Sequence, residues 1–180
     1  MSRAVALHVC CGPCASACVP RLVAGGREVT MVFANSNIDT AEEFEKRRAA
    51  AAALAEHDGV AFEVIPYDHA EWLREVAAGF ESEPERGRRC ARCFRYSLRK
   101  VAEFAAARGI GSFTTSLTVS PHKVSREVFA AGREAGEHGG PAFLPEDFKK
   151  GEGFKLSVKR AKELGLYRQS YCGCEFSRRK

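Results

Sequence analysis

Length, composition and charge place the chain among ordinary globular proteins. It has 180 residues, of which 45% are hydrophobic and 28% charged, with a formal net charge of +5, and this composition excludes solenoid and low-complexity architectures. The first apolar run, residues 4–11, is too short for a signal peptide or a membrane span, and Gly12 and Pro13 follow it directly, so no membrane contact is expected.

Five short stretches rich in apolar or β-branched residues, each bounded by Gly, Pro or Asp, predict strands. They cover residues 4–10, 28–33, 60–65, 112–115 and 142–144. Between them, Thr40 and Glu43 form a capping box for a helix that runs to about Glu56. Further helices are predicted at 68–78, 93–108, 122–138 and 155–164.

This alternation of strands and helices predicts an α/β fold. We expect a single domain over residues 1–180, with a mostly parallel sheet of about five strands joined by right-handed crossovers. Ligands of such sheets bind beyond the carboxyl ends of the strands. The first cysteines follow one strand at this edge, and Thr114, Thr115 and Ser116 end another.

Eight cysteines fall into three separated sets. They are Cys10, Cys11, Cys14 and Cys18, then Cys90 and Cys93, and then Cys172 and Cys174. Short cysteine motifs in a chain without a secretory signature indicate a reducing compartment, where such motifs bind metal or catalyse more often than they form disulfides. We therefore expect a cytoplasmic, metal-binding protein.

The second and third sets each place two sulfurs close together. Cys90 and Cys93 open a predicted helix, where free N–H groups and the helix dipole favour thiolates. Alone, this pair would suit a redox dithiol or half a zinc site better than an iron–sulfur cluster. Cys172 and Cys174 lie on one side of an extended segment, which suits a metal or cluster better than a disulfide.

The first set has a different spacing. Cys10 and Cys11 are adjacent, so in a strand their side chains should point to opposite faces and serve two neighbouring metal centres. Cys14 follows a Gly-Pro bend and can turn back to the same place, whereas Cys18 is expected to pack in the core. The other seven cysteines suffice for a four-thiolate cluster and a second metal with an open coordination position.

Six motifs, three of which carry cysteines, follow one another over nearly the whole chain. They are HVCCGPC at 8–14, NSNI at 35–38 with EFEKR at 43–47, EPER at 83–86 leading to CARCFR at 90–95, TTSLTVSPHK at 114–123, DFKK at 147–150 and LYRQSYCGC at 166–174. Together they resemble the QueH-type epoxyqueuosine reductases. The resemblance implies a Rossmann-like, cobalamin-independent metalloenzyme that reduces epoxyqueuosine to queuosine at the wobble base of tRNA, with a 4Fe-4S cluster beside a separately ligated mononuclear iron.

The resemblance also bears on how the ligands are divided. In some relatives Asp stands where this chain has Cys14, and because both residues ligate iron, the alternation favours Cys14 as a ligand of the lone iron. We assign Cys10, Cys14 and Cys174 to that iron. We assign to the cluster Cys11, Cys90, Cys93 and Cys172.

Other residues of the motifs are expected to take part in catalysis. They are His8, Arg47, His122 and Lys123. Each also has a structural interpretation: a strand histidine is more often structural than catalytic, and Arg47 can simply pair with Glu43 at i,i+4 spacing. His122 and Lys123 are expected at a helix start, where we favour anion binding over capping.

Residues 86–100, around the second cysteine pair, are strongly basic, which suits a polyanion such as tRNA as well as a solvated face. The modified base would leave the anticodon loop to reach a buried metal, and reduced ferredoxin or flavodoxin would supply electrons. Trp72 is expected in the core rather than against a base. The expected tRNA contacts are Asn35, Asn37, Arg86, Arg88, Arg95, Lys149, Lys150, Tyr167 and Arg168.

Two other functions stay open from the residues alone. In the first, zinc holds the cysteines of an RNA-binding module that has no turnover. The second is an ATP-dependent tRNA-thiolation enzyme, which needs a glycine-rich phosphate loop after the first strand. Thiols occupy that loop here, from Cys10 to Cys14, and this disfavours ATP chemistry.

Overall fold

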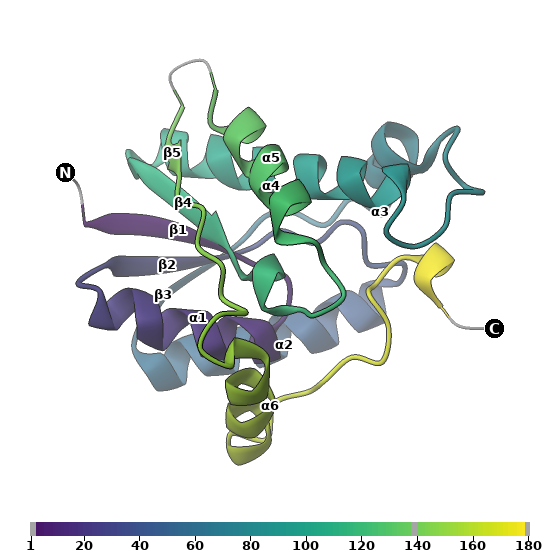
Figure 1. Ribbon diagram of the computed structural model, residues 1–180. Helices are drawn as coiled ribbons and strands as arrows, with labels where there is room; N and C mark the ends of the chain where they lie inside the picture. The colour runs from purple at the N-terminus through teal and green to yellow at the C-terminus, as the bar shows by residue number, and fades with distance from the viewer. Residues whose placement is uncertain (1–2, 138–139, 179–180) are drawn as a thin grey trace.

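A five-stranded parallel sheet forms the centre of the structure (Figure 1). The computed structural model describes residues 3–137 and 140–178. The strand order is β3-β2-β1-β4-β5 and every neighbouring pair is parallel, which confirms the predicted fold class. The strands are β1 (Ala4–Val9), β2 (Glu28–Phe33), β3 (Ala61–Val64), β4 (Ser112–Thr115) and β5 (Ala142–Phe143).

Helices cover both faces of this sheet (Figure 1). α1 (Gly12–Ala24) and α2 (Ala41–Asp58) lie on one face, and α4 (Arg88–Ala107) and α5 (Ser125–Ala135) lie on the other. α6 (Gly153–Glu163) packs against α1. Within the described residues, no helix is long and apolar enough to cross a membrane. The shorter elements are α3 (His69–Trp72), the π-helical turn η1 (Leu73–Ala77), and the 3-10 turns η2 (Ser116–Val119) and η3 (Glu175–Ser177).

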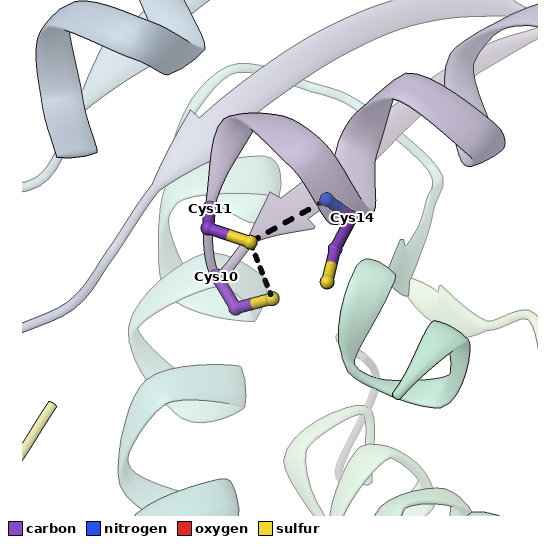
Figure 2. Close-up of side chains that lie close together, drawn as sticks. All are labelled: Cys10, Cys11 and Cys14. Atoms are coloured by element: carbon purple, nitrogen blue, oxygen red, sulfur yellow. Dashed lines mark hydrogen bonds between the residues drawn. The ribbon is translucent and has the colours of Figure 1, made fainter. Parts of the chain in front are cut away.

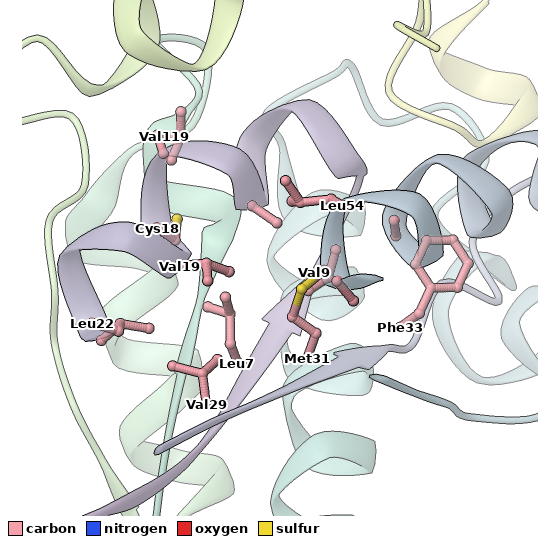
Figure 3. Close-up of a cluster of buried hydrophobic side chains, with 14 of the residues drawn as sticks. Leu7, Val9, Cys18, Val19, Leu22, Val29, Met31, Phe33, Leu54 and Val119 are labelled. Carbon is pink, nitrogen blue, oxygen red and sulfur yellow. The ribbon is translucent and has the colours of Figure 1, made fainter. Parts of the chain in front are cut away.

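The alternation of side chains along β1 separates two hydrophobic cores. Leu7 and Val9 point toward α1 and α2 and pack with Cys18, which confirms the predicted core position of that cysteine (Figure 3). Ala6 faces the other side and packs with Leu98 of α4. Because helices bury both faces, five of the six residues of the central strand β1 are apolar.

Local signals set the ends of α2 as predicted. Thr40 is the N-cap, and its hydroxyl accepts a hydrogen bond from the backbone N–H of Glu43 at 3.2 Å. Gly59 ends the helix with a positive φ of 66°, a conformation that glycine adopts without steric cost. The helix therefore runs to Asp58, slightly beyond the expected end at Glu56.

Other helix bounds differ from the prediction. α4 begins at Arg88 rather than at 93, so Cys90 lies inside its first turn. No bounds were predicted for α1, which contains Pro20 in its interior; Pro13 lies in the first turn, where the missing N–H costs nothing. The helix predicted at 122–138 begins only at Ser125, and His138 lies outside the described residues.

Candidate metal centre

A small cavity beyond the carboxyl ends of β1 and β4 brings the three cysteine sets together. Its volume is about 90 Å³. It lies at the sheet edge where the sequence predicted a ligand site. The cysteines that line it are Cys10, Cys14, Cys93 and Cys172.

Cys10, Cys11 and Cys14 form a compact group (Figure 2). Their Sγ atoms all lie within 4.8 Å of one another, and those of Cys10 and Cys11 are 3.9 Å apart. The prediction that Cys10 and Cys11 point to opposite faces is wrong, because β1 ends at Val9 and strand alternation does not continue into Cys11. Cys11 is instead the N-cap of α1, and its sulfur accepts the backbone N–H of Cys14 at 3.4 Å.

Contacts among these thiols separate their pKa values. Hydrogen bonds with Cys10 and then Cys14 hold the pKa of Cys11 well below its ordinary value, and the side-chain amide of Gln169 acts in the same direction. Hydrogen bonds with Cys10 and Cys11 hold the pKa of Cys14 well above its ordinary value. Cys11 is therefore the thiol of this group that most readily provides a thiolate, the form that binds metal.

The other four ligand candidates form a second group. Cys90 and Cys93 lie one turn apart on α4, and Cys174 belongs to a small buried cluster with Trp72, against which Cys93 packs. Burial is the main cause that raises the pKa of Cys93, and the neighbouring Cys172 and Cys174 thiols raise it further. Burial and the same two neighbours raise the pKa of Cys90. All four sulfurs thus lie near enough to act on one another.

Arg47 positions the segment that carries Cys172. Its side chain is buried and forms the predicted ion pair with Glu43, at 2.7 Å from Nε to Oε1. Nη1 donates to the carbonyl of Cys172 at 2.7 Å, and Nη2 donates to that of Tyr171 at 3.1 Å. The guanidinium therefore binds the backbone behind the cysteines, and these contacts indicate a positioning role.

His8 and Lys123 line the small cavity. His8 is buried, with Nδ1 at 2.9 Å from Thr115 Oγ1 and Nε2 at 3.3 Å from the Ala34 carbonyl. Burial lowers the pKa of His8, so its imidazole is neutral. Lys123 Nζ lies 3.8 Å from Cys172 Sγ; burial alone would lower the pKa of Lys123, but the surrounding thiolates raise it above its ordinary value.

His122 and Lys123 do not start a helix, because α5 begins at Ser125 with Val124 as its N-cap. Both residues lie in the turn before it. His122 is exposed, and its Nδ1 lies 2.9 Å from Nη2 of Arg86. The two segments that carry these residues therefore meet beside the cysteines.

Several residues expected to contact tRNA already have partners in the protein. Arg88 pairs with Glu83 at 2.6 Å and Arg95 pairs with Glu134 at 2.8 Å. Lys149 is half-buried and reaches Ser125 Oγ at 2.8 Å. Lys150 and Arg168 are exposed.

The remaining expected contacts are divided between the cavity and the surface. Asn35 and Asn37 line the small cavity. Asn35 is buried and donates to the Val9 carbonyl at 2.7 Å. Tyr167 is exposed, and its hydroxyl donates to Glu43 at 2.9 Å.

A second cavity, of about 350 Å³, adjoins the cysteines. Cys11, Cys14 and Cys172 line it, as do residues that the sequence analysis did not assign to the site, notably Phe154 and Gln169. Gln169 lies three positions before Cys172, inside a cysteine-bearing motif, and this position could have identified it as a site residue. Phe154 had no such signal, because its place at the cavity depends on how α6 packs.

Comparison with known proteins gives a consistent assignment. Residues 5–180 match the protein-family model described as Epoxyqueuosine reductase QueH. A protein of that name from Streptococcus pyogenes serotype M1 is 36% identical over 179 residues, covering 96% of this chain and 69% of the relative. Another, from Thermotoga maritima, is 35% identical over 176 residues and covers 96% of this chain and 89% of the relative.

The fold also resembles that of a solved structure. The U34-tRNA thiolase NcsA from Methanococcus maripaludis, described with its 4Fe-4S cluster, superposes with a TM-score of 0.61 and 11% sequence identity. The match covers 97% of this chain and 61% of the thiolase chain. At this identity the likeness concerns the fold alone.

Proposed function

Because this chain belongs to the Epoxyqueuosine reductase QueH family, an oxidoreductase family of queuosine biosynthesis, we propose that it reduces epoxyqueuosine to queuosine in tRNA. The observation that carries the proposal is the meeting of three cysteine segments around one cavity. The reaction removes the epoxide oxygen as water and leaves an alkene, so it consumes two electrons and two protons. Cysteine-bound iron is suited to deliver such electrons singly.

We propose that Cys10, Cys11 and Cys14 hold the mononuclear iron. Thiolates on one tetrahedral ion, at a metal–sulfur distance of about 2.3 Å as in zinc sites, lie about 3.8 Å apart. The 3.9 Å between the sulfurs of Cys10 and Cys11 is close to that value, and Cys14 Sγ is within 4.8 Å of both. A cubane instead binds its thiolates to different irons, which spaces them more widely.

The cluster is then left with four other thiols. The sequence analysis assigned Cys11 to the cluster and Cys174 to the single iron. This proposal exchanges them, so that Cys11 binds the single iron and Cys174 binds the cluster. Its support is that Cys93 packs against the buried cluster that contains Cys174, and that, after burial, the neighbouring Cys172, Cys174 and Cys90 raise the pKa of Cys93. The proposed cluster ligands are Cys90, Cys93, Cys172 and Cys174.

Unpartnered polar atoms beside the cysteines support a bound group at these positions. Among the described residues, buried side-chain atoms without a partner are Trp72 Nε1, Arg89 Nε and Gln169 Oε1. Trp72 lies beside Cys93, Arg89 acts on Cys90 and Cys174, and Gln169 acts on Cys11. Such atoms are rare in folded proteins, and their gathering here fits a metal or cluster.

When bound, the cluster supplies electrons and the lone iron acts as a Lewis acid toward oxygen. The chain shapes and charges the cavity around them. Neutral His8, held by Thr115, fixes the wall formed by β1 and β4. Lys123 brings a positive charge and N–H donors to the side of Cys172, where they can stabilise the departing oxygen. A reduced ferredoxin or flavodoxin is the proposed electron donor.

We propose that the modified base enters through the larger cavity. The anticodon loop is single-stranded, so a base can be turned out at low cost. Arg86, His122 and Arg168 line this cavity together with Tyr171. Arg168 makes no ion pair or hydrogen bond with the described residues, so it is available to phosphate.

The thiolase-like fold does not favour thiolation chemistry for this chain. α1 begins at Gly12 with Cys11 as its N-cap, so a thiol stands where a phosphate loop would present a helix N-terminus to an anion. That structural neighbour is described with a 4Fe-4S cluster, and a fold of this kind can therefore hold one.

Anaerobic purification followed by iron and sulfide analysis tests the proposal. We expect about five irons and four acid-labile sulfides per chain, the sum of one cubane and one single iron. The same sample, given a low-potential reductant, should convert epoxyqueuosine to queuosine in tRNA. Stoichiometric zinc without sulfide would contradict the proposal and favour a zinc-structured RNA-binding module.

A further inference from the structure

The indole N–H of Trp72 is a buried donor without an acceptor. Trp72 is only 1% exposed, and its Nε1 makes no hydrogen bond with any described residue. The indole has no other polar atom, so nothing else compensates for removing this group from water. A buried N–H of this kind requires an explanation, and a ligand that accepts the bond is one.

The surroundings of Trp72 show where that acceptor would lie. The side chain belongs to a small buried cluster with Val76, Tyr96 and Cys174, against which Cys93 also packs. The buried cluster that contains Trp72 therefore includes or touches a cysteine from each of the two pairs proposed to hold the iron–sulfur cluster. Trp72 is followed directly in sequence by the π-helical turn η1, and helical distortions of this type often occur at functional sites.

Cys93 is the thiol beside the indole N–H. Its side chain packs against the buried cluster that contains Trp72, and the N–H lies near enough to its sulfur to act on it. The contact falls short of hydrogen-bond geometry to the Cys93 thiol itself. A ligating thiolate, or a sulfide of the cluster beside it, offers an acceptor with more negative charge.

Arg89, whose Nε is the other unpartnered donor of this region, has a different structural role. Its Nη1 donates to the carbonyls of Phe80, at 2.9 Å, and Glu83, at 2.6 Å, and its guanidinium stacks on Phe176 at 4.4 Å. Arg89 thus already stabilises the loop before α4. Trp72 has no such second role for its polar atom.

We propose that Trp72 is a positioning residue of the redox centre, whose Nε1–H donates a hydrogen bond to a sulfur of the cluster held by Cys90, Cys93, Cys172 and Cys174. This inference rests on the cluster proposed above. A hydrogen bond to sulfur disperses negative charge, and reduction adds negative charge, so the bond favours the reduced state. Trp72 therefore raises the reduction potential of the cluster.

The test compares the anaerobically prepared parent protein with Trp72→Phe and Tyr96→Phe variants. Tyr96 belongs to the same buried cluster, but its hydroxyl donates to Glu71 and not to sulfur, so it is the matched control. Iron and sulfide are counted first, and the midpoint potential is then measured by a redox titration followed by electron paramagnetic resonance. We expect full metal content in each protein and a more negative potential only in Trp72→Phe.

An unchanged potential in a fully loaded Trp72→Phe protein would overturn the role of Trp72 and leave the cluster itself in place. Absence of sulfide from the parent protein would instead overturn the proposed function. If Trp72→Phe loses its metal, the parent protein still decides the question. Trp72 is the only tryptophan, so indole-15N labelling reports on it alone. Magnetic coupling of that nitrogen and its exchangeable proton to the reduced cluster is expected, and no coupling would overturn the inference.

Discussion

Cys11 occupies the N-cap of α1, and this position returns its sulfur toward Cys10. An N-cap residue has extended backbone angles, here φ −166° and ψ 161°, while the next residue is already helical. The chain also bends at Cys10, directly after β1 ends at Val9, so strand alternation does not continue from Cys10 to Cys11. A pair that would be split between faces in a strand becomes able to share one ion.

Replacing Cys11 with alanine should remove the mononuclear iron and leave about four irons and four sulfides per chain. The reason is that Cys11 lies with Cys10 and Cys14, apart from the four proposed cluster ligands. Cys18→Ala is the matched control, because Cys18 is fully buried in the apolar core on the same helix and should not affect metal content. Iron and sulfide analysis measures both. Loss of sulfide from the Cys11 variant would contradict the proposed division of ligands.

Arg47→Gln should destabilise the protein by about 3–5 kcal/mol, the usual cost of breaking a buried ion pair. The substitution leaves the Glu43 carboxylate buried without its cation and frees the carbonyls of Tyr171 and Cys172. Urea denaturation gives the stability, and hydrogen exchange at residues 171–174 should become faster.

Arg48→Gln is the control for this variant, because it removes the neighbouring ion pair with Glu45 at the surface of the same helix. It should leave both the stability and the exchange rates nearly unchanged. Equal effects of the two substitutions would show that Arg47 does not hold the cysteine segment.

At the scale of elements, α6 is fixed to the rest of the fold by Arg160. Its guanidinium binds the carboxylate of Asp58 at the end of α2, with 2.9 Å from Nη1 to Oδ2, and Nη1 also donates to the carbonyl of Ser16 in α1 at 2.9 Å. Three helices that are distant in sequence thus meet at one side chain. Because Phe154 of α6 lines the larger cavity, this contact also places part of the site.

The stability that Asp58 contributes should depend on pH. Burial acts to raise the pKa of Asp58, but the hydrogen bonds from Arg160 and His57, together with the charges of these two residues, outweigh it and hold the pKa below its ordinary value. A carboxylate whose pKa is lower in the folded state than in the unfolded state stabilises the fold at pH values above the unfolded-state pKa. This contribution is lost as the pH falls through the folded-state pKa.

Asp58→Asn should therefore cost about 1.5–3 kcal/mol near neutral pH, the range for a charged hydrogen bond. The difference from the parent should begin to shrink below about pH 4, the ordinary pKa of aspartate. Thermal unfolding from pH 7 to pH 3 measures it. Glu163→Gln, at a solvent-exposed pair with Lys159, is the control and should show little effect at any pH. A cost for Asp58→Asn that did not change with pH would contradict the electrostatic origin.

At the scale of the whole molecule, the basic residues divide into two classes. Arg92 and Arg99 of α4 bind η1, through the carbonyl of Val76 at 3.1 Å and the carboxylate of Glu75 at 2.8 Å. Such arginines hold elements together. The arginines at the larger cavity, which have no carboxylate partner among the described residues, are better placed to meet tRNA phosphates.

The double variant Arg86→Gln, Arg168→Gln should weaken tRNA binding and flatten its salt dependence. Each phosphate contact contributes roughly 0.7 to 0.9 to the slope of log affinity against log salt, so removing two should lower the slope by up to about twice that amount. Binding titrations at several salt concentrations measure it, with iron content checked first. Arg95→Gln is the control, because Arg95 is paired with Glu134. A reduced slope in the control but not in the double variant would place the tRNA on α4 instead.

Much of the fold follows from local chemistry that the sequence displays. β2 and β4 begin and end where apolar, β-branched runs predicted them, and the capping box at Thr40 starts α2. The start of α4 was missed, because Gly87 has no side-chain signal for an N-cap and yet serves as one. Local signals are short-range, so they identify elements better than they locate the ends of elements.

The sequence by itself determined that this is an α/β protein, that its first cysteines lie at the carboxyl edge of the sheet, and which family it resembles. These results need only the spacing of residues along the chain and the rule that parallel strands end at one edge. Tertiary structure alone decided which cysteines share a group, that Arg47 binds the backbone of Cys172, and that the Trp72 N–H is buried beside Cys93. Such contacts join residues far apart in sequence, and they depend on how elements pack, which no local pattern encodes.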